Sequence, residues 1–180
     1  MMFKFDTYIV LDVPPPISER VMEVRVRHQD EFRSSLPVEI TLAGSSGVGV
    51  LVREQDRAEV FGQLQVIARE TSPIIAEFGK VLRFEGTDIF VLTIKDESPF
   101  QRLHKVILDS GIRFMASPFP YKPHCTLRSR SPVSEKEAAD LLGLRIEGAV
   151  KLRMLSVYMM SGLPMELLFT TALCVDREAG

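Results

Sequence analysis

The stretch Tyr121-Lys122-Pro123-His124-Cys125-Thr126-Leu127 sets two polar, chemically competent side chains into an otherwise apolar run typical of a strand. Since successive side chains of a strand point to opposite faces, His124 and Thr126 share one face, and the residue after each turns into the core. An imidazole exchanges a proton near neutral pH, and a hydroxyl donates a hydrogen bond to an anionic oxygen. The pair suits acid–base chemistry on a phosphate ester, although a purely structural histidine gives the same tripeptide.

A second stretch, Leu36-Pro37-Val38-Glu39-Ile40-Thr41-Leu42, echoes the first with a proline before the polar position and the same closing Thr-Leu pair. Glu39 precedes His124 by 85 residues. In a strand, Glu39 and Thr41 again share a face, with the residue after each directed into the core. We therefore expect two acid–base groups to converge on one site.

Composition limits the classes of function. The chain has 180 residues, of which 46% are hydrophobic, which is enough for one domain with a sizeable core. A formal net charge of −2 gives no overall electrostatic attraction for long nucleic acid, but leaves room for a small ligand or a nucleic-acid end.

Location and redox state follow from the apolar segments and the cysteines. Cys125 and Cys174 both lie in apolar runs, which favours buried free thiols over a disulfide. No signal peptide and no membrane-spanning segment is evident in the sequence, so we expect a cytoplasmic protein without a membrane partner. The sequence leaves the oligomeric state open, and a monomer is plausible.

Hydrophobic periodicity predicts a chain that alternates strands and helices. A proline run after the first strand and capping boxes at Asp56 and Ser134 mark element ends. The Gly44–Gly49 loop is either a plain turn, which we favour, or a nest of backbone amides for an anion. His104 is expected on a solvated helix face. The predicted strands are 6–13, the two motif strands, 74–84, 88–94, 150–160 and 165–175, the last two forming a hairpin, and the predicted helices are 17–33, 56–72, 98–111 and 134–142.

This order repeats, because each half of the chain reads strand, helix, motif strand, helix, strand. We predict one α+β domain over residues 1–180, with two pseudo-symmetric lobes of approximately 1–86 and 87–180 and with strands open to exchange between the lobes. Two mostly antiparallel sheets then face a central groove, with the helices on the outside.

The two motifs and their spacing resemble those of the two-histidine (2H) phosphoesterases, a superfamily that includes 2'-5' RNA ligases and RNA 2',3'-cyclic phosphodiesterases. Family members carry two H-x-T/S motifs on strands of a pseudo-symmetric bilobal α+β fold. His124-Cys125-Thr126 matches the second motif in full, whereas Glu39 stands where the first histidine is expected. The resemblance covers nearly the whole chain.

The resemblance implies metal-independent acid–base catalysis, without a cofactor, on a 2',3'-cyclic phosphate or 2'-5' phosphodiester at the end of an RNA or nucleotide. His124 is then the general acid or base, and Thr126 and Thr41 hold the phosphate oxygens, so that phosphate or sulfate should bind in the groove. One hypothesis makes Glu39 the base and protonated His124 the acid. The alternative is a non-catalytic protein that binds a nucleotide or phosphorylated metabolite after losing one catalytic histidine.

Three further residues beside the second motif are candidates for substrate binding. Lys122 and Arg128 bracket the strand and lend positive charge to a phosphate site, and Tyr121 offers a surface on which a nucleobase stacks. A solvated rim and simple packing are the other interpretations of these residues. Arg153 and Tyr158 stand on opposite faces of a late strand, so at most one of them faces the groove.

Overall fold

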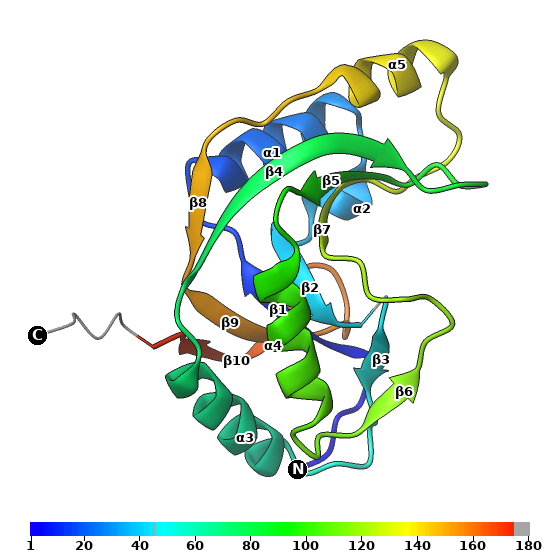
Figure 1. Cartoon of the computed structure of the whole chain (residues 1–180). Coiled ribbons are helices and arrows are strands. Elements are labelled where there is room, and N and C mark those ends of the chain that lie inside the picture. Colours follow the sequence, from blue (N-terminus) through cyan, green and yellow to red (C-terminus); the bar gives the residue numbers. More distant parts are fainter. Residues whose placement is uncertain (45, 175–180) are drawn as a thin grey trace, which may run out of the picture.

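Two antiparallel four-stranded sheets form the body of the molecule (Figure 1). The computed structural model describes residues 1–44 and 46–174. The helices are α1 (Ile17–Arg27), α2 (Glu31–Ser34), α3 (Arg57–Glu70), α4 (Ser98–Leu108) and α5 (Glu135–Gly143). The strands are β1 (Thr7–Asp12), β2 (Glu39–Ala43), β3 (Val48–Leu51), β4 (Ile74–Arg83), β5 (Phe90–Ile94), β6 (Phe114–Ala116), β7 (His124–Arg128), β8 (Ala149–Leu152), β9 (Met154–Met159) and β10 (Glu166–Ala172).

The sheet topology places the two motif strands next to each other. The strand orders are β10-β9-β1-β2 and β7-β5-β4-β8, and β3 pairs with β6 in a small separate sheet. Thus β2 and β7 are each the edge strand of their sheet, and the two strands are in contact. Helices α1 and α5 lie at one end of the molecule and α3 at the other (Figure 1). This arrangement confirms the predicted α+β fold with antiparallel sheets.

Alternation along the motif strands follows the predicted faces. In β2, Ile40 and Leu42 are fully buried, whereas Glu39 and Thr41 are only partly buried. In β7, Cys125 and Leu127 are fully buried. The apolar side chains belong to one continuous core shared by both sheets, so burial fixes the register of each strand.

The predicted helix 17–33 is wrong as one element, because it is two helices with a break between them. His28 ends α1, and Gln29 has a positive φ of 52°. Asp30 then begins α2, since its carboxylate accepts a hydrogen bond from the backbone N–H of Arg33 at 2.9 Å. The first backbone N–H groups of a helix have no acceptor within the helix, and a short carboxylate side chain accepts from one of them, which is why aspartate is favoured at the residue before a helix.

The predicted strand 150–160 is also wrong as one element, because the chain changes sheet at Arg153. Strand β8 pairs with β4 in one sheet, whereas β9 pairs with β1 in the other. The hairpin expected at the end of the chain is confirmed by the antiparallel pairing of β9 with β10. Position 175, the predicted end of that hairpin, lies outside the described residues.

The loop from Gly44 to Gly47 joins β2 to β3, a strand that hydrophobic periodicity did not predict. Ser45 in this loop lies outside the described residues, and the anion-nest interpretation stays a prediction. Cys125 and Cys174 do not form a disulfide with each other, as expected, but only Cys125 is buried and Cys174 is partly exposed. No helix within the described part of the chain has the length and apolar character needed to cross a membrane.

One fully buried side chain, Arg25 on α1, connects the two motif strands. Its Nε and Nη2 donate hydrogen bonds to the carbonyl oxygen of Thr126, at 3.2 and 2.9 Å. Its Nη1 donates to the carbonyl oxygens of Arg33, Leu36 and Pro37, at 2.9, 3.0 and 3.2 Å. One guanidinium group thereby holds the middle of β7 against the segment that leads into β2.

We expect Arg25→Met to lower the free energy of unfolding by about 3 kcal/mol or more, because it leaves four buried carbonyl groups without their donor. Urea denaturation followed by circular dichroism measures the change. Arg27→Met, two residues along the same helix but exposed, is the matched control and should stay within about 0.5 kcal/mol of the wild type. Equal stability of the two variants would contradict the role given to Arg25.

Candidate active site

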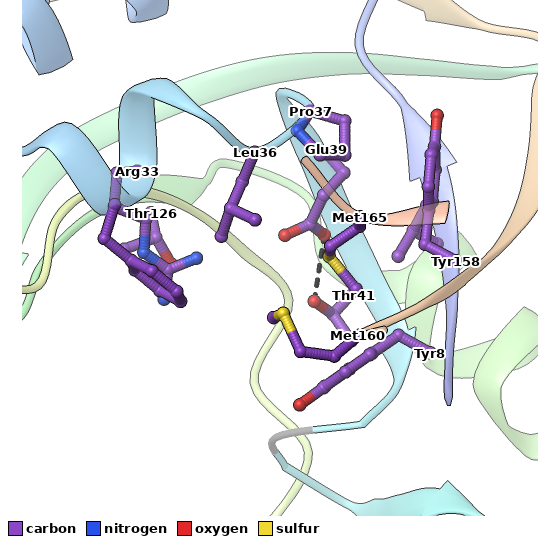
Figure 2. Close-up of a pocket in the computed structure, with 12 residues that line it drawn as sticks. Tyr8, Arg33, Leu36, Pro37, Glu39, Thr41, Thr126, Tyr158, Met160 and Met165 are labelled. Atoms are coloured by element: carbon purple, nitrogen blue, oxygen red, sulfur yellow. Dashed lines mark hydrogen bonds between the residues drawn. The ribbon is translucent and has the colours of Figure 1, made fainter. Parts of the chain in front are cut away.

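A cavity of about 150 Å³ opens where β2, β7 and α2 meet (Figure 2). It brings together three of the four residues predicted to be catalytic: Glu39, Thr41 and Thr126. Figure 2 shows Arg33 and Thr126 on one side of the cavity and Tyr8 and Tyr158 on the other. The remaining lining residues are Val10, Phe32, Leu36, Pro37, Met160 and Met165.

Glu39 is a partly desolvated carboxyl group on the cavity wall. The hydroxyl of Thr41 donates a hydrogen bond to Glu39 Oε2 at 2.9 Å. Burial raises the pKa of Glu39 above its ordinary value, while the positive charge of Arg33 acts in the opposite direction. A raised pKa favours the protonated carboxyl group, which is able to donate a proton.

Arg33, which the sequence analysis did not identify, supplies the cationic group of the cavity. Its Nε donates a hydrogen bond to Ser129 Oγ at 2.9 Å, which fixes the guanidinium group near β7. Burial lowers the pKa of Arg33, although an arginine remains charged. Its positive charge lowers the pKa of both Glu39 and His124, so this one cation acts on both candidate acid–base groups.

His124 begins β7, two residues before Thr126, but is not among the residues that line the cavity. Its Nδ1 donates a hydrogen bond to the carbonyl oxygen of Lys122 at 2.6 Å, since a carbonyl oxygen only accepts. In the neutral ring, Nε2 is then the proton acceptor. Burial lowers the pKa of His124, which favours this neutral form. The ring also packs edge-on against Phe84, with centroids 5.3 Å apart.

Aromatic and thioether side chains from β1 and from the β9–β10 region form the apolar wall of the cavity, which is suited to a planar ring. Tyr158 donates its hydroxyl hydrogen to Asp12 Oδ1 at 3.2 Å. Burial and the nearby Asp12 carboxylate raise the pKa of Tyr158 to about 12, so the phenol stays protonated. Of the two residues left open by the sequence, Tyr158 lines the cavity, and Arg153 is exposed and lies outside it.

The three predicted substrate-binding residues lie outside this cavity. The ring of Tyr121 stacks on His104 with centroids 3.9 Å apart, and its hydroxyl donates to the carbonyl oxygen of Thr41 at 3.2 Å. Lys122 forms an ion pair with Glu97. Arg128 lines a second cavity. Their roles in binding substrate stay predictions.

His104 is buried, so the expectation of a solvated helix face is wrong. Helix α4 packs against β2, and His104 Nδ1 donates a hydrogen bond to the carbonyl oxygen of Leu42 at 2.7 Å. Together with Tyr121 it therefore supports the backbone of β2 from the side. Among the described residues, no group of three or more His, Cys, Asp or Glu side chains is arranged to hold a metal ion.

We expect Glu39→Gln to stabilise the protein at neutral pH. Below pH 4.5, the ordinary pKa of the group, the carboxyl is neutral in both folded and unfolded chains. As the pH rises, the unfolded chain loses this proton first, so wild-type stability falls until the raised folded-state pKa is passed. The variant has no ionisable group at this position, so it does not lose stability in this way. The difference in stability between variant and wild type should be absent near pH 4 and should reach its maximum above the folded-state pKa.

Denaturant unfolding across this pH range measures the difference, with the exposed Glu70→Gln as the control that should show none. A Glu39→Gln protein that is less stable than the wild type at pH 8 would contradict a raised pKa for Glu39.

Known proteins with the same fold include several nucleotide-bound structures. Escherichia coli LigT complexed with 3'-AMP is 16% identical, covers 94% of this chain and 98% of its own, and has a TM-score of 0.61. TT0787 of Thermus thermophilus is 14% identical, covers 95% and 99%, and has a TM-score of 0.65. Kluyveromyces marxianus Usb1 is 10% identical, covers 96% and 99%, and has a TM-score of 0.56. At these identities the likeness shows the fold.

The sequence itself carries the family assignment. No curated protein matches the chain significantly. The family model of the 2'-5' RNA ligase superfamily, however, matches residues 13–158, a span that contains both motif strands and α2. The chain therefore belongs to the 2'-5' RNA ligase superfamily of 2H phosphoesterases.

Proposed function

We propose that the protein is a phosphoesterase that acts, without a metal ion, on a 2',3'-cyclic phosphate or 2'-5' phosphodiester at the end of an RNA or nucleotide. The observation that carries this proposal is the convergence of Glu39, Thr41, Thr126 and the Arg33 guanidinium on one cavity between the two motif strands. These are a proton-exchanging group with the threonine hydroxyl that binds it, a second hydroxyl as a donor, and one cation, a set suited to phosphodiester chemistry.

The cavity suits a nucleotide on chemical grounds. Arg33 and the Thr126 hydroxyl offer donors to phosphate oxygens, whereas the Thr41 hydroxyl already donates to Glu39, and Tyr8 and Tyr158 offer faces for a base or a sugar. Structures of LigT complexed with 3'-AMP, with ATP, with NADP+ and with phosphate support nucleotide and phosphate binding by this fold. A ligand phosphate beside Arg33 also replaces part of the solvent that the buried guanidinium has lost.

The pKa directions favour a division of labour opposite to the one suggested by the sequence. His124 does not line the cavity but shares a strand face with Thr126, which does. With its lowered pKa it is the base in this proposal: its Nε2 removes a proton from the attacking water. The oxygen of that water forms the new bond to phosphorus. Glu39, whose pKa is raised, is the acid: its carboxyl proton passes to the leaving ribose oxygen as the phosphorus–oxygen bond breaks.

A bound phosphate strengthens this arrangement. The negative charge of the phosphate opposes ionisation of the nearby Glu39 carboxyl group, so the acid stays protonated when substrate is present. The hydrogen bond from Thr41 restricts the rotation of the Glu39 carboxyl, and the hydrogen bond from His124 Nδ1 to the Lys122 carbonyl keeps Nε2 as the acceptor. The carboxyl rotamer and the imidazole tautomer are thus set before substrate binds.

We expect the wild type to hydrolyse at least one member of a panel of 2',3'-cyclic nucleotides, and we expect His124→Ala to reduce kcat by about a hundredfold to ten-thousandfold. Initial rates followed by chromatography of the nucleoside monophosphate measure this. Partial recovery of His124→Ala by added imidazole would identify the lost group as a base. Binding of the same nucleotides without turnover would instead support the non-catalytic alternative.

A substrate with a better leaving group distinguishes the residue that acts as the acid from the residue that acts as the base. Glu39→Gln should lose activity on a cyclic nucleotide, whose ribose oxygen needs a proton, but lose less than about tenfold on a nucleoside p-nitrophenyl phosphodiester, whose leaving group departs unprotonated. His124→Ala should lose activity on both. If His124→Ala keeps its activity on the p-nitrophenyl ester and Glu39→Gln loses it, the two roles are the reverse of those proposed here.

A further inference from the structure

A second cavity, larger than the first, lies between the end of α1, the end of β7 and the start of α5. Four cationic side chains line it, Arg27, Arg128, Arg130 and Lys136, against two carboxylates, Glu137 and Asp140. The whole chain has a formal net charge of −2, so this excess of positive charge is local. Its volume of about 850 Å³ is ample for part of a nucleotide strand.

The buried members of this cavity are already paired with each other. Arg128 Nε donates to Glu137 Oε1 at 2.6 Å, and its Nη1 donates to the carbonyl oxygen of Arg130 at 2.6 Å. His28 Nδ1 lies 3.2 Å from the same carboxylate oxygen of Glu137. Arg128 and Glu137 therefore build the floor of the cavity and neutralise each other.

The cations that remain are free to bind an anion. Arg27, Arg130 and Lys136 are exposed, and within the described residues no ion pair or side-chain hydrogen bond engages the side chain of Arg27 or Lys136. The carboxylate that remains against them is that of Asp140 on α5. Three cations against one anion leave this rim positive.

Phe32 connects the second cavity to the candidate active site. Its ring lines the first cavity, and the guanidinium carbon of Arg33, which lines the same cavity, lies 5.6 Å from the ring centroid. The guanidinium carbon of Arg130, which lines the second cavity, lies 4.5 Å from the same centroid. A continuous path of cation, aromatic ring and cation thus leads from one cavity to the other. Alternation of basic and aromatic groups is the arrangement that single-stranded nucleic acids bind.

We infer that the second cavity binds a backbone phosphate of a single-stranded oligonucleotide whose end occupies the candidate active site. The inference rests on the proposed function for the place of that end, and it adds a second binding site between the ends of α1 and β7 and the start of α5. The strand crosses Phe32, with its bases or sugars against the ring, and a phosphate beyond it meets Arg27, Arg130 and Lys136. The preferred substrate is accordingly an oligonucleotide, and a mononucleotide uses only part of the binding surface.

The test measures binding of oligoadenylates of one to six nucleotides, each with a 3'-phosphate and a fluorescent label at the 5' end, by anisotropy. The wild-type affinity should rise with length. In Arg27→Ala/Lys136→Ala the gain from one to six nucleotides should fall by roughly tenfold, and the slope of log affinity against log salt should become shallower by about 0.7 for each phosphate that the variant no longer binds. Both residues are exposed, so the variant should fold, and its thermal midpoint verifies that.

The matched control is Arg69→Ala/Arg102→Ala, which removes the same two charges from exposed positions on α3 and α4. It should keep the wild-type gain with length. The inference is overturned if the wild type shows no gain, if the cavity variant keeps the full gain, or if the control loses as much as the cavity variant. Because the readout is binding, a protein without turnover but with a gain that depends on Arg27 and Lys136 contradicts the proposed function and supports this site.

Discussion

The hydrogen bonds of the buried Arg25 guanidinium are the constraint on which the candidate site depends. One side of this group engages the carbonyl oxygen of Thr126 in β7, and another engages the chain just before Glu39 in β2. Burying a charge away from water is costly unless hydrogen bonds compensate it, and here backbone carbonyls from β7 and from the segment that leads into β2 do so. The fully buried Asp30 adds a second tie, because its carboxylate accepts from the backbone N–H of Ser129 at 2.7 Å. The spacing of the two motifs is thereby fixed by charged groups within the core.

The same burial that holds the site together also tunes its chemistry. Desolvation raises the pKa of a carboxyl group and lowers that of an imidazole, so both Glu39 and His124 are shifted toward their neutral forms. Two histidines in this environment would each be shifted downward. The opposite shifts of Glu39 and His124 are those that the proposed assignment of Glu39 as acid and His124 as base requires.

The sequence correctly predicted those features of the site that depend on the local alternation of polar and apolar residues. Strict alternation placed Glu39, Thr41 and Thr126 on one face and Ile40 and Cys125 in the core, because a one-residue slip would expose the whole apolar set. Arg33 and Phe32 could not be identified in this way. They lie on the separate helix α2, which begins at Asp30, and the Asp30 carboxylate also accepts a hydrogen bond from Ser129, 99 residues further along the chain. The burial of His104 against β2 likewise depends on a partner element that its own helix does not indicate.

The pairing of β1 with β9 has a consequence for how the protein is made. Val10 lies opposite Ser156 in the sheet that carries Glu39, so β1 lacks one of its neighbours until the chain has been synthesised beyond Ser156. Pairing across such a distance in sequence must overcome a large loop-closure entropy before the two strands stabilise each other. The sheet behind the cavity is therefore completed only after β9 has been synthesised, and a product truncated before β9 lacks the central strand pair of this sheet.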